Sequence, residues 1–188
     1  IGDLELIVVL DESYYNINID LKNKGLVSKL YSFEGAYSVS GTTDNNNLIP
    51  SEYSQYWKTN KKERLVKIFF EKSFINKMVL VPKEEEFARV DFVEIKNFVD
   101  PLSSFIKILL GHKTSKTIDG RRIYSMVVDY DEENKKKIKI FIDDYVNIWT
   151  DHKRNDLEEI SIINKSNSYL PEAIYISFRG RMFRVLKN

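Results

Sequence analysis

Apolar and polar residues alternate along most of this chain, and a period of two residues is typical of β-strands with one buried face. The pattern is clear at residues 15–22, where Tyr15, Ile17, Ile19 and Leu21 are separated by asparagine and aspartate. We expect further strands at residues 4–10, 33–41, 52–59, 64–72, 77–81, 122–130, 136–144, 159–164, 173–178 and 182–186. About ten strands with turn residues between them predict a mainly β fold, a curved antiparallel sheet or half-open barrel.

One window, residues 100–110, has helical spacing instead. Its apolar stripe consists of Leu102, Phe105, Ile106, Leu109 and Leu110. Asp100 suits the N-cap and Pro101 the first helical position, while Gly111 suits the left-handed residue that ends a helix. A helix this short needs a surface to lie on. We therefore expect the sheet to wrap around this helix and to bury its stripe on the concave face.

Two other segments are less regular. Residues 83–99, KEEEFARVDFVEIKNFV, fit an acidic connector that leads into a short strand about as well as they fit a helix. Residues 42–47, TTDNNN, have the composition of a loop.

The composition limits the class of protein. With 188 residues, 43% hydrophobic and 30% charged, the chain is typical of a soluble globular protein. No linker-like stretch interrupts it, so we expect a single domain over residues 1–188. A net charge of +1 argues against a nucleic-acid partner. No apolar run approaches the roughly 18 residues of a transmembrane helix.

The sequence offers little to bind a metal or to catalyse a reaction. The absence of cysteine excludes disulfides, thiolate nucleophiles and cysteine zinc sites. Asp129, Asp131 and Glu133 resemble the start of a calcium loop, but Asn134 stands where glycine is needed and Ile140 where glutamate is needed. No phosphate loop or nucleophile motif is present. We expect no metal and no cofactor.

The chain has two histidines, His112 and His152, which are candidate functional residues. His112 follows the predicted helix, where a cation interacts favourably with the last carbonyls, and we interpret it as structural. His152 lies in a polar turn, and a hydrolase that uses His152 with Asp156 is our least favoured alternative.

Basic and aromatic residues suggest a ligand site. Arg179, Arg181 and Arg184 form either a polar outer face or a contact for an anionic group. We interpret Trp57 and Trp149 as residues of strands whose apolar and polar residues alternate. They either fill the core or line a pocket that the sheet leaves open.

Four segments together resemble a known family. They are residues 53–71, YSQYWKTNKKERLVKIFFE; residues 100–111, DPLSSFIKILLG; residues 119–128, DGRRIYSMVV; and residues 170–186, LPEAIYISFRGRMFRVL. In this order they resemble the exported proteins of Gram-negative bacteria catalogued as domain of unknown function 3108.

The resemblance implies a periplasmic or outer-membrane-associated location and a curved sheet on a helix, similar to lipoprotein-carrier folds. It also implies a signal peptide and one more strand before Ile1. It supplies no catalytic residues. Many members carry a cysteine near residues 136–142, which this chain lacks, so a redox or metal role through that residue is excluded here.

The function predicted from these observations is a non-enzymatic envelope protein that binds or carries an apolar, lipid-like ligand such as a lipoprotein acyl chain. The predicted ligand-binding residues are Tyr56, Trp57, Phe105, Leu109, Arg121, Arg122 and Trp149. In this hypothesis the aromatic residues contact the apolar part and the arginines meet an anionic head. The alternative is a structural or interaction protein with a filled interior, which docks onto another envelope protein through a sheet edge or an apolar patch.

Overall fold

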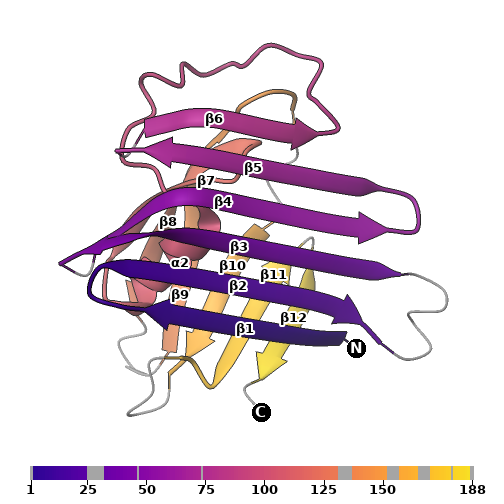
Figure 1. The fold of residues 1–188 in the computed structure, drawn as a ribbon. Coiled ribbons are helices and arrows are strands. Elements are labelled where there is room, and N and C mark those ends of the chain that lie inside the picture. The colour runs from indigo at the N-terminus through magenta and orange to yellow at the C-terminus, as the bar shows by residue number, and fades with distance from the viewer. Residues whose placement is uncertain are drawn as a thin grey trace.

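The computed structural model describes residues 2–24, 32–45, 47–72, 74–130, 137–151, 157–164, 170–178 and 180–186. Within these ranges the chain forms twelve β-strands and one α-helix (Figure 1). In chain order they are β1 (Gly2–Leu10), β2 (Tyr14–Asn23), β3 (Phe33–Asp44), β4 (Asn47–Thr59), β5 (Glu63–Glu71), β6 (Phe74–Val81), α2 (Pro101–Leu109), β7 (Thr114–Ile118), β8 (Arg122–Tyr130), β9 (Lys137–Asn147), β10 (Leu157–Ile163), β11 (Ala173–Phe178) and β12 (Arg181–Leu186). The predicted mainly β class with one helix is confirmed.

The described strands form two antiparallel sheets of six strands each. The first sheet runs from β1 to β6 and the second from β7 to β12, and each strand pairs with its neighbour in sequence. Neither sheet closes into a barrel. The strands divide into two sheets after β6 because the chain then leaves the first sheet through residues 82–100, which form no extended strand.

Residues 82–100 are a connector rather than a helix, which decides between the two interpretations of this segment. Lys96 forms an isolated bridge with Phe74 at the edge of the first sheet. Val99 lies beside β7, where its N–H donates to the carbonyl of Lys116 (3.0 Å) and its carbonyl accepts from the N–H of Ile118 (2.9 Å). The connector therefore covers the β6 and β7 edges, on the side of the molecule away from β1 and β12 (Figure 1).

All the predicted strands are present, and the structure differs from the prediction at two other places. The loop predicted at residues 42–47 is shorter than expected, because β3 continues to Asp44, a turn follows at Asn45, and β4 begins at Asn47. Strand β7 was not predicted at all. Its buried positions Ser115 and Thr117 carry hydroxyl groups, so no apolar alternation marks it in the sequence.

Helix α2 has the predicted bounds and ends. The carboxylate of Asp100 accepts hydrogen bonds from the backbone N–H groups of Leu102 (2.9 Å) and Ser103 (3.0 Å), which have no partner inside the helix. Gly111 has a φ of +100°, the left-handed conformation that ends a helix.

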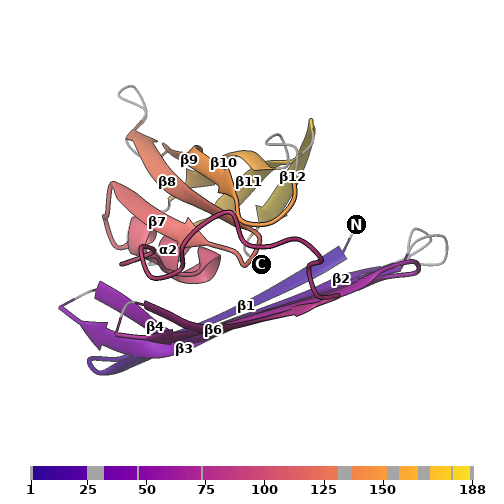
Figure 2. The ribbon, with the colours of Figure 1, turned by 90° about the horizontal axis from the view of Figure 1, so that it is seen from above.

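The helix lies between the two sheets (Figure 2). Its predicted stripe packs on the first sheet, where Ile106 is buried among side chains of β2 to β5. The opposite face is also covered, since Ile108 is 2% exposed and packs on the second sheet. Phe105 and Leu109 contact both hydrophobic clusters. The sequence indicated one buried face of α2, and the second sheet buries the other.

Hydroxyl groups fix the start of α2 to both sheets. Ser103 donates to the carboxylate of Asp100, so the hydroxyl of Tyr15 on β2 donates to Ser103 (2.7 Å). On the other side Ser104 shares hydrogen bonds with the hydroxyls of Ser115 (2.9 Å) and Thr117 (2.6 Å) on β7. Buried polar groups need such partners, and here they set the position of α2 between the sheets.

Candidate functional site

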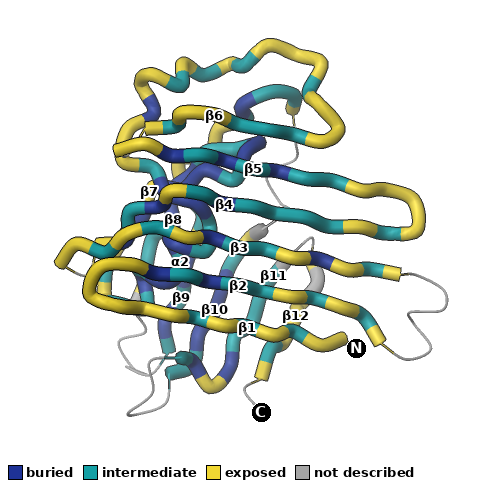
Figure 3. Tube along the Cα trace, viewed as in Figure 1, coloured by how far each residue is buried: buried dark blue, intermediate teal, exposed yellow. Residues whose placement is uncertain are grey.

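The face of the first sheet that contacts α2 continues beyond the helix. Beneath the helix this inner face is closed, and Tyr15, Ile17, Val39, Tyr53 and Ile68 are each at most 1% exposed. Farther along the same strands the inner-facing residues are only half-buried: Ile19, Leu21, Phe33, Tyr37, Gln55, Trp57 and Arg64. At this end the first sheet extends past the second (Figure 2), and burial decreases along β2 to β5 (Figure 3). Solvent therefore reaches an inner face that is rich in aromatic residues.

Phe33, Tyr37 and Trp57, which we call the aromatic platform, surround Gly35. Gly35 lies between Phe33 and Tyr37 on β3 and pairs with Trp57 on β4. A Cβ atom on Gly35 would lie 3.3 Å from Cε2 of Tyr37 and 3.5 Å from Cζ of Phe33, so both rings lean over the glycine. None of the three rings belongs to the hydrophobic clusters around α2. The platform thus presents apolar ring surface that no described core residue covers.

Arg64 extends the platform toward β5. It pairs with Trp57 across the strands, and its guanidinium carbon lies 5.7 Å from the centroid of a Trp57 ring, within the range of a cation–π contact. Burial lowers the pKa of Arg64, the nearby cations Arg121 and Arg122 lower it further, and the carboxylate of Glu84 opposes this shift. In the described part of the chain no carboxylate lies within salt-bridge distance of Arg64.

The turn between β7 and β8 brings two more arginines to this region. The carboxylate of Asp119 accepts from the backbone N–H groups of Arg121 (2.9 Å) and Arg122 (2.8 Å), which closes the turn. Gly120 has a φ of +88°, and a Cβ atom there would lie 2.4 Å from Cγ1 of Val66 on β5. Only glycine lets this turn approach the first sheet so closely.

These two arginines already have acidic partners. Nε of Arg121 lies 2.8 Å from Glu84 in the connector, and both side chains are less than a fifth exposed. Arg122 lies 3.9 Å from Asp119, with its guanidinium 5.8 Å from the centroid of the Tyr145 ring. Burial raises the pKa of Asp119, and Arg122 opposes that rise. Among the described residues, Arg121 and Arg122 thus each have a carboxylate partner within salt-bridge distance, and Arg64 does not.

The structure brings together only part of the predicted site. Trp57 lies on the inner face of the first sheet, and Arg121 and Arg122 belong to the turn that packs on Val66 of the same sheet. Phe105 and Leu109 fill the core between the sheets instead of lining a ligand site.

The other two predicted aromatic residues have different surroundings. Trp149 donates from Nε1 to the carbonyl of Gly120 (2.9 Å), and its ring centroid lies 5.9 Å from that of Phe92. Trp149 therefore supports the turn that carries Arg121 and Arg122. Tyr56 lies on the outer face of β4, where its hydroxyl donates to Glu63 (3.2 Å), and it does not join the site.

Sequence reasoning missed Phe33, Tyr37 and Arg64. The alternation already placed Phe33 and Tyr37 on one face of a strand. The pairing of β3 with β4 and of β4 with β5 was needed to place both of them, and Arg64, next to Trp57.

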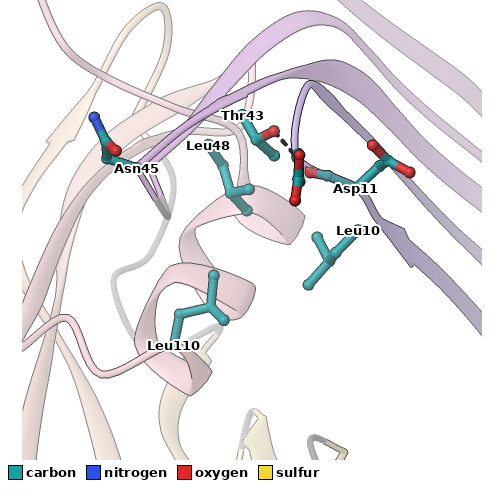
Figure 4. Close-up of a pocket in the computed structure, with 7 residues that line it drawn as sticks. Leu10, Asp11, Thr43, Asn45, Leu48 and Leu110 are labelled. Carbon is teal, nitrogen blue, oxygen red and sulfur yellow. Dashed lines mark hydrogen bonds between the residues drawn. The ribbon is translucent and has the colours of Figure 1, made fainter.

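A separate hollow of about 290 Å³ lies beside Leu110, at the C-terminal end of α2 (Figure 4). It is lined by Leu10, Asp11, Glu12, Thr43, Asn45, Leu48 and Leu110. The hydroxyl of Thr43 donates to the backbone carbonyl of Asp11 (2.8 Å) at its rim. None of the predicted ligand-binding residues is among these seven.

The structure describes the surroundings of only some of the other candidate residues from the sequence. The backbone N–H of His112 donates to the carbonyl of Lys107 (3.1 Å), as part of the end of the helix. The guanidinium of Arg184 lies 5.5 Å from the centroid of the Tyr175 ring. His152, Asp156, Arg179 and the calcium-like residues 131–134 lie outside the described residues, as does the side chain of Arg181. In the ranges that the structure describes, no helix has the length and hydrophobicity needed to cross a membrane.

No known family model matches this chain, and neither the curated proteins nor the solved structures gave a match. The resemblance to domain of unknown function 3108 is therefore neither confirmed nor refuted, and it stays a prediction.

Proposed function

We propose that this protein is a non-enzymatic binding or carrier protein of the bacterial envelope, which holds an apolar, lipid-like ligand against the aromatic platform. One observation carries the proposal: Phe33, Tyr37 and Trp57 lie on the inner face of a sheet, yet they are half-buried and outside both hydrophobic clusters. Apolar surface of this kind favours a ligand, because covering it removes ring area from water. The envelope location rests on the resemblance described above.

The chemistry of the platform favours binding over catalysis. Its rings supply apolar contact, and Gln55 supplies a polar group beside them. Burial raises the pKa of Tyr37, so its hydroxyl is uncharged near neutral pH. The described platform residues include no nucleophile paired with a base, the arrangement that acyl or phosphoryl chemistry requires.

The first test is direct. The protein is purified without detergent and extracted with organic solvent, and the extract is analysed by lipid mass spectrometry. Isothermal titration with decanol, below the concentration at which it separates from water, then measures binding of a neutral apolar ligand.

Substitution of two adjacent residues on opposite faces of β4 tests which face binds the ligand. Trp57→Ala is expected to lower decanol affinity about tenfold, because a large ring surface is lost. Tyr56→Ala, the adjacent residue on the outer face, is the control and is expected to leave the affinity unchanged. Absence of lipid in the extract together with no heat of decanol binding would refute the proposal.

A second candidate function is docking onto another envelope component, and the exposed edge of the first sheet favours it. In the described ranges no strand pairs with the outer edge of β1. On this strand Ile7, Val9 and Leu10 are 49%, 41% and 43% exposed, and no charged residue lies between Leu6 and Leu10. Long apolar edges of this kind pair readily with an additional strand, which either a partner protein or the strand that the resemblance implies before Ile1 would supply.

Photocrosslinking in a Gram-negative host tests this candidate. A photoreactive residue at position 9 is expected to yield a protein adduct. The same residue in place of Ser40, on the outer face of β3, is expected to yield none. Equal yields at both positions, or no adduct at either, would count against docking through β1.

A further inference from the structure

The guanidinium of Arg64 has a place in the proposed site that the aromatic platform alone does not explain. Arg64 projects from β5 over Trp57, on the same inner face as the platform. It is half-buried, so part of its hydration is lost. Cations in such positions usually have a carboxylate partner, and none of the described carboxylates lies within 4.0 Å of it.

Arg121 and Arg122 increase the positive potential instead of relieving it. Both belong to the turn that packs on Val66, two residues from Arg64 along β5. Glu84 lies 2.8 Å from Arg121, and Asp119 is engaged by Arg122 and by two backbone N–H groups. Both carboxylates are therefore bound within the turn, and Glu84 acts on Arg64 only from beyond salt-bridge distance.

From this arrangement we infer that the ligand on the aromatic platform carries one negative charge, which Arg64 recognises. The ligand class is an amphiphile with an apolar body and an anionic head, such as a carboxylate or a phosphate. The inference rests on the proposed function and adds the residue that determines head-group specificity. Arg121 and Arg122 are not assigned to the head group, since each already has an acidic partner.

The contact that Arg64 makes with Trp57 fits this assignment. A cation–π contact with the Trp57 ring uses none of the guanidinium N–H groups as hydrogen-bond donors to oxygen, and the planar guanidinium can donate to two oxygen atoms at once. The apolar body would then lie on the neighbouring rings of Tyr37 and Phe33. One ligand would thus use both chemical features of the site.

Titration calorimetry with ligands of equal chain length tests the inference. Decanol, decanoate and decyltrimethylammonium are compared at pH 7, below their aggregation concentrations. Decanoate is expected to bind about tenfold more tightly than decanol, as a charge-assisted hydrogen bond in a half-buried site provides. The cationic ligand is expected to bind more weakly than decanol.

Variants of Arg64 assign the preference to this residue. Arg64→Gln is expected to abolish the preference, so that decanoate and decanol bind equally to this variant. Arg64→Lys is expected to keep part of the preference, because the charge remains but the planar pair of donors is lost. Arg184→Gln on the second sheet is the control and is expected to change neither affinity. Thermal melts of all variants establish that they are folded.

The outcomes separate the inference from the proposed function. Equal binding of decanol and decanoate by the parent protein would overturn the inference and leave the carrier function standing, as would a preference that survives Arg64→Gln. Binding of neither ligand would refute both. Titration with decyl phosphate compares a phosphate head group with a carboxylate. A decyl phosphate affinity within about threefold of the decanoate affinity supports recognition of a single charge. A far higher affinity for decyl phosphate would overturn the inference that the ligand carries one negative charge.

Discussion

The two halves of the inner face of the first sheet have the same strands and the same alternation but different surroundings. Ile17 and Leu21 lie on the same face of β2, yet Ile17 is 1% exposed beneath α2 and Leu21 is half-buried beyond it. Apolar residues at every second position therefore indicate which face of a strand points inward. They do not indicate whether a helix or another sheet covers that face. The uncovered half is where we place the ligand.

The largest difference in stability between the two halves of the inner face is expected when an aspartate replaces an apolar residue. Phe105→Asp should abolish cooperative folding, because Phe105 contacts both hydrophobic clusters and a carboxylate there would lack a partner. Leu21→Asp, in the open half, should leave a cooperative thermal transition. Circular dichroism melts measure both, and a parent-like melt of the Phe105 variant would contradict the described packing of α2.

Truncation of one apolar side chain in each half of the inner face compares the two halves on the single strand β2. Ile17→Ala should lower the free energy of unfolding by about 2–5 kcal/mol, as expected for a buried cavity. Leu21→Ala should lower it by less than about 1 kcal/mol, because water already reaches that side chain. Urea denaturation measures the two values, and similar losses would mean that the far half is as closed as the near one.

The closed half should also make stability depend on pH. Burial raises the pKa of Asp100 to about 6, whereas an unfolded aspartate has a pKa of about 3.9. Between these values the folded state binds more protons than the unfolded state, so stability falls as pH rises from about 4 to 6 and is then level. The expected loss is about 2–3 kcal/mol.

Asp100→Asn isolates this dependence, because asparagine keeps an acceptor for the N-cap hydrogen bonds. Urea denaturation at pH 4, 5, 6 and 7 should show a smaller fall in the variant than in the parent. Asp119, whose pKa burial also raises, contributes equally to both proteins. Parallel curves would show that the carboxyl group of Asp100 is ionised as easily in the folded state as in the unfolded one.

The smallest effect is expected on the outer face. Tyr56→Phe removes the hydrogen bond to Glu63, which is exposed to solvent. Neither stability nor decanol binding should change measurably, as judged by thermal melts and titration calorimetry. A clear loss of decanol binding in this variant would place the ligand on the outer face of the first sheet and contradict the site that we propose.

The sequence predicted the elements of the fold more fully than their arrangement. The stripe and caps of α2 are local features, so residues 100–111 sufficed to predict the helix and its ends. The division into two sheets depends on where residues 82–100 lead the chain, and their composition favoured two structures equally. Strand β7 was missed because its buried hydroxyls reach Ser104, a contact that the spacing of apolar residues does not reveal.

The site was predicted in part for similar reasons. Arg121 and Arg122 follow Asp119 and Gly120 in a turn that can be read from adjacent residues. Trp57 and Tyr56 looked equivalent in the sequence, but adjacent residues on a strand face opposite sides, and only Trp57 faces inward. Arg64 joins Trp57 through the register of β4 and β5, which residues far apart in the chain determine.

The consecutive pairing of strands has a consequence for synthesis on the ribosome. Each strand of the first sheet pairs with the one translated just before it, so β1 to β6 can assemble as successive hairpins while the rest of the chain is still being made. The apolar inner face of these strands then stays exposed to solvent until residues 100–110 leave the ribosome and cover it. This interval is the stage at which the nascent chain is most exposed to aggregation, and slower translation between Val81 and Pro101 would prolong it.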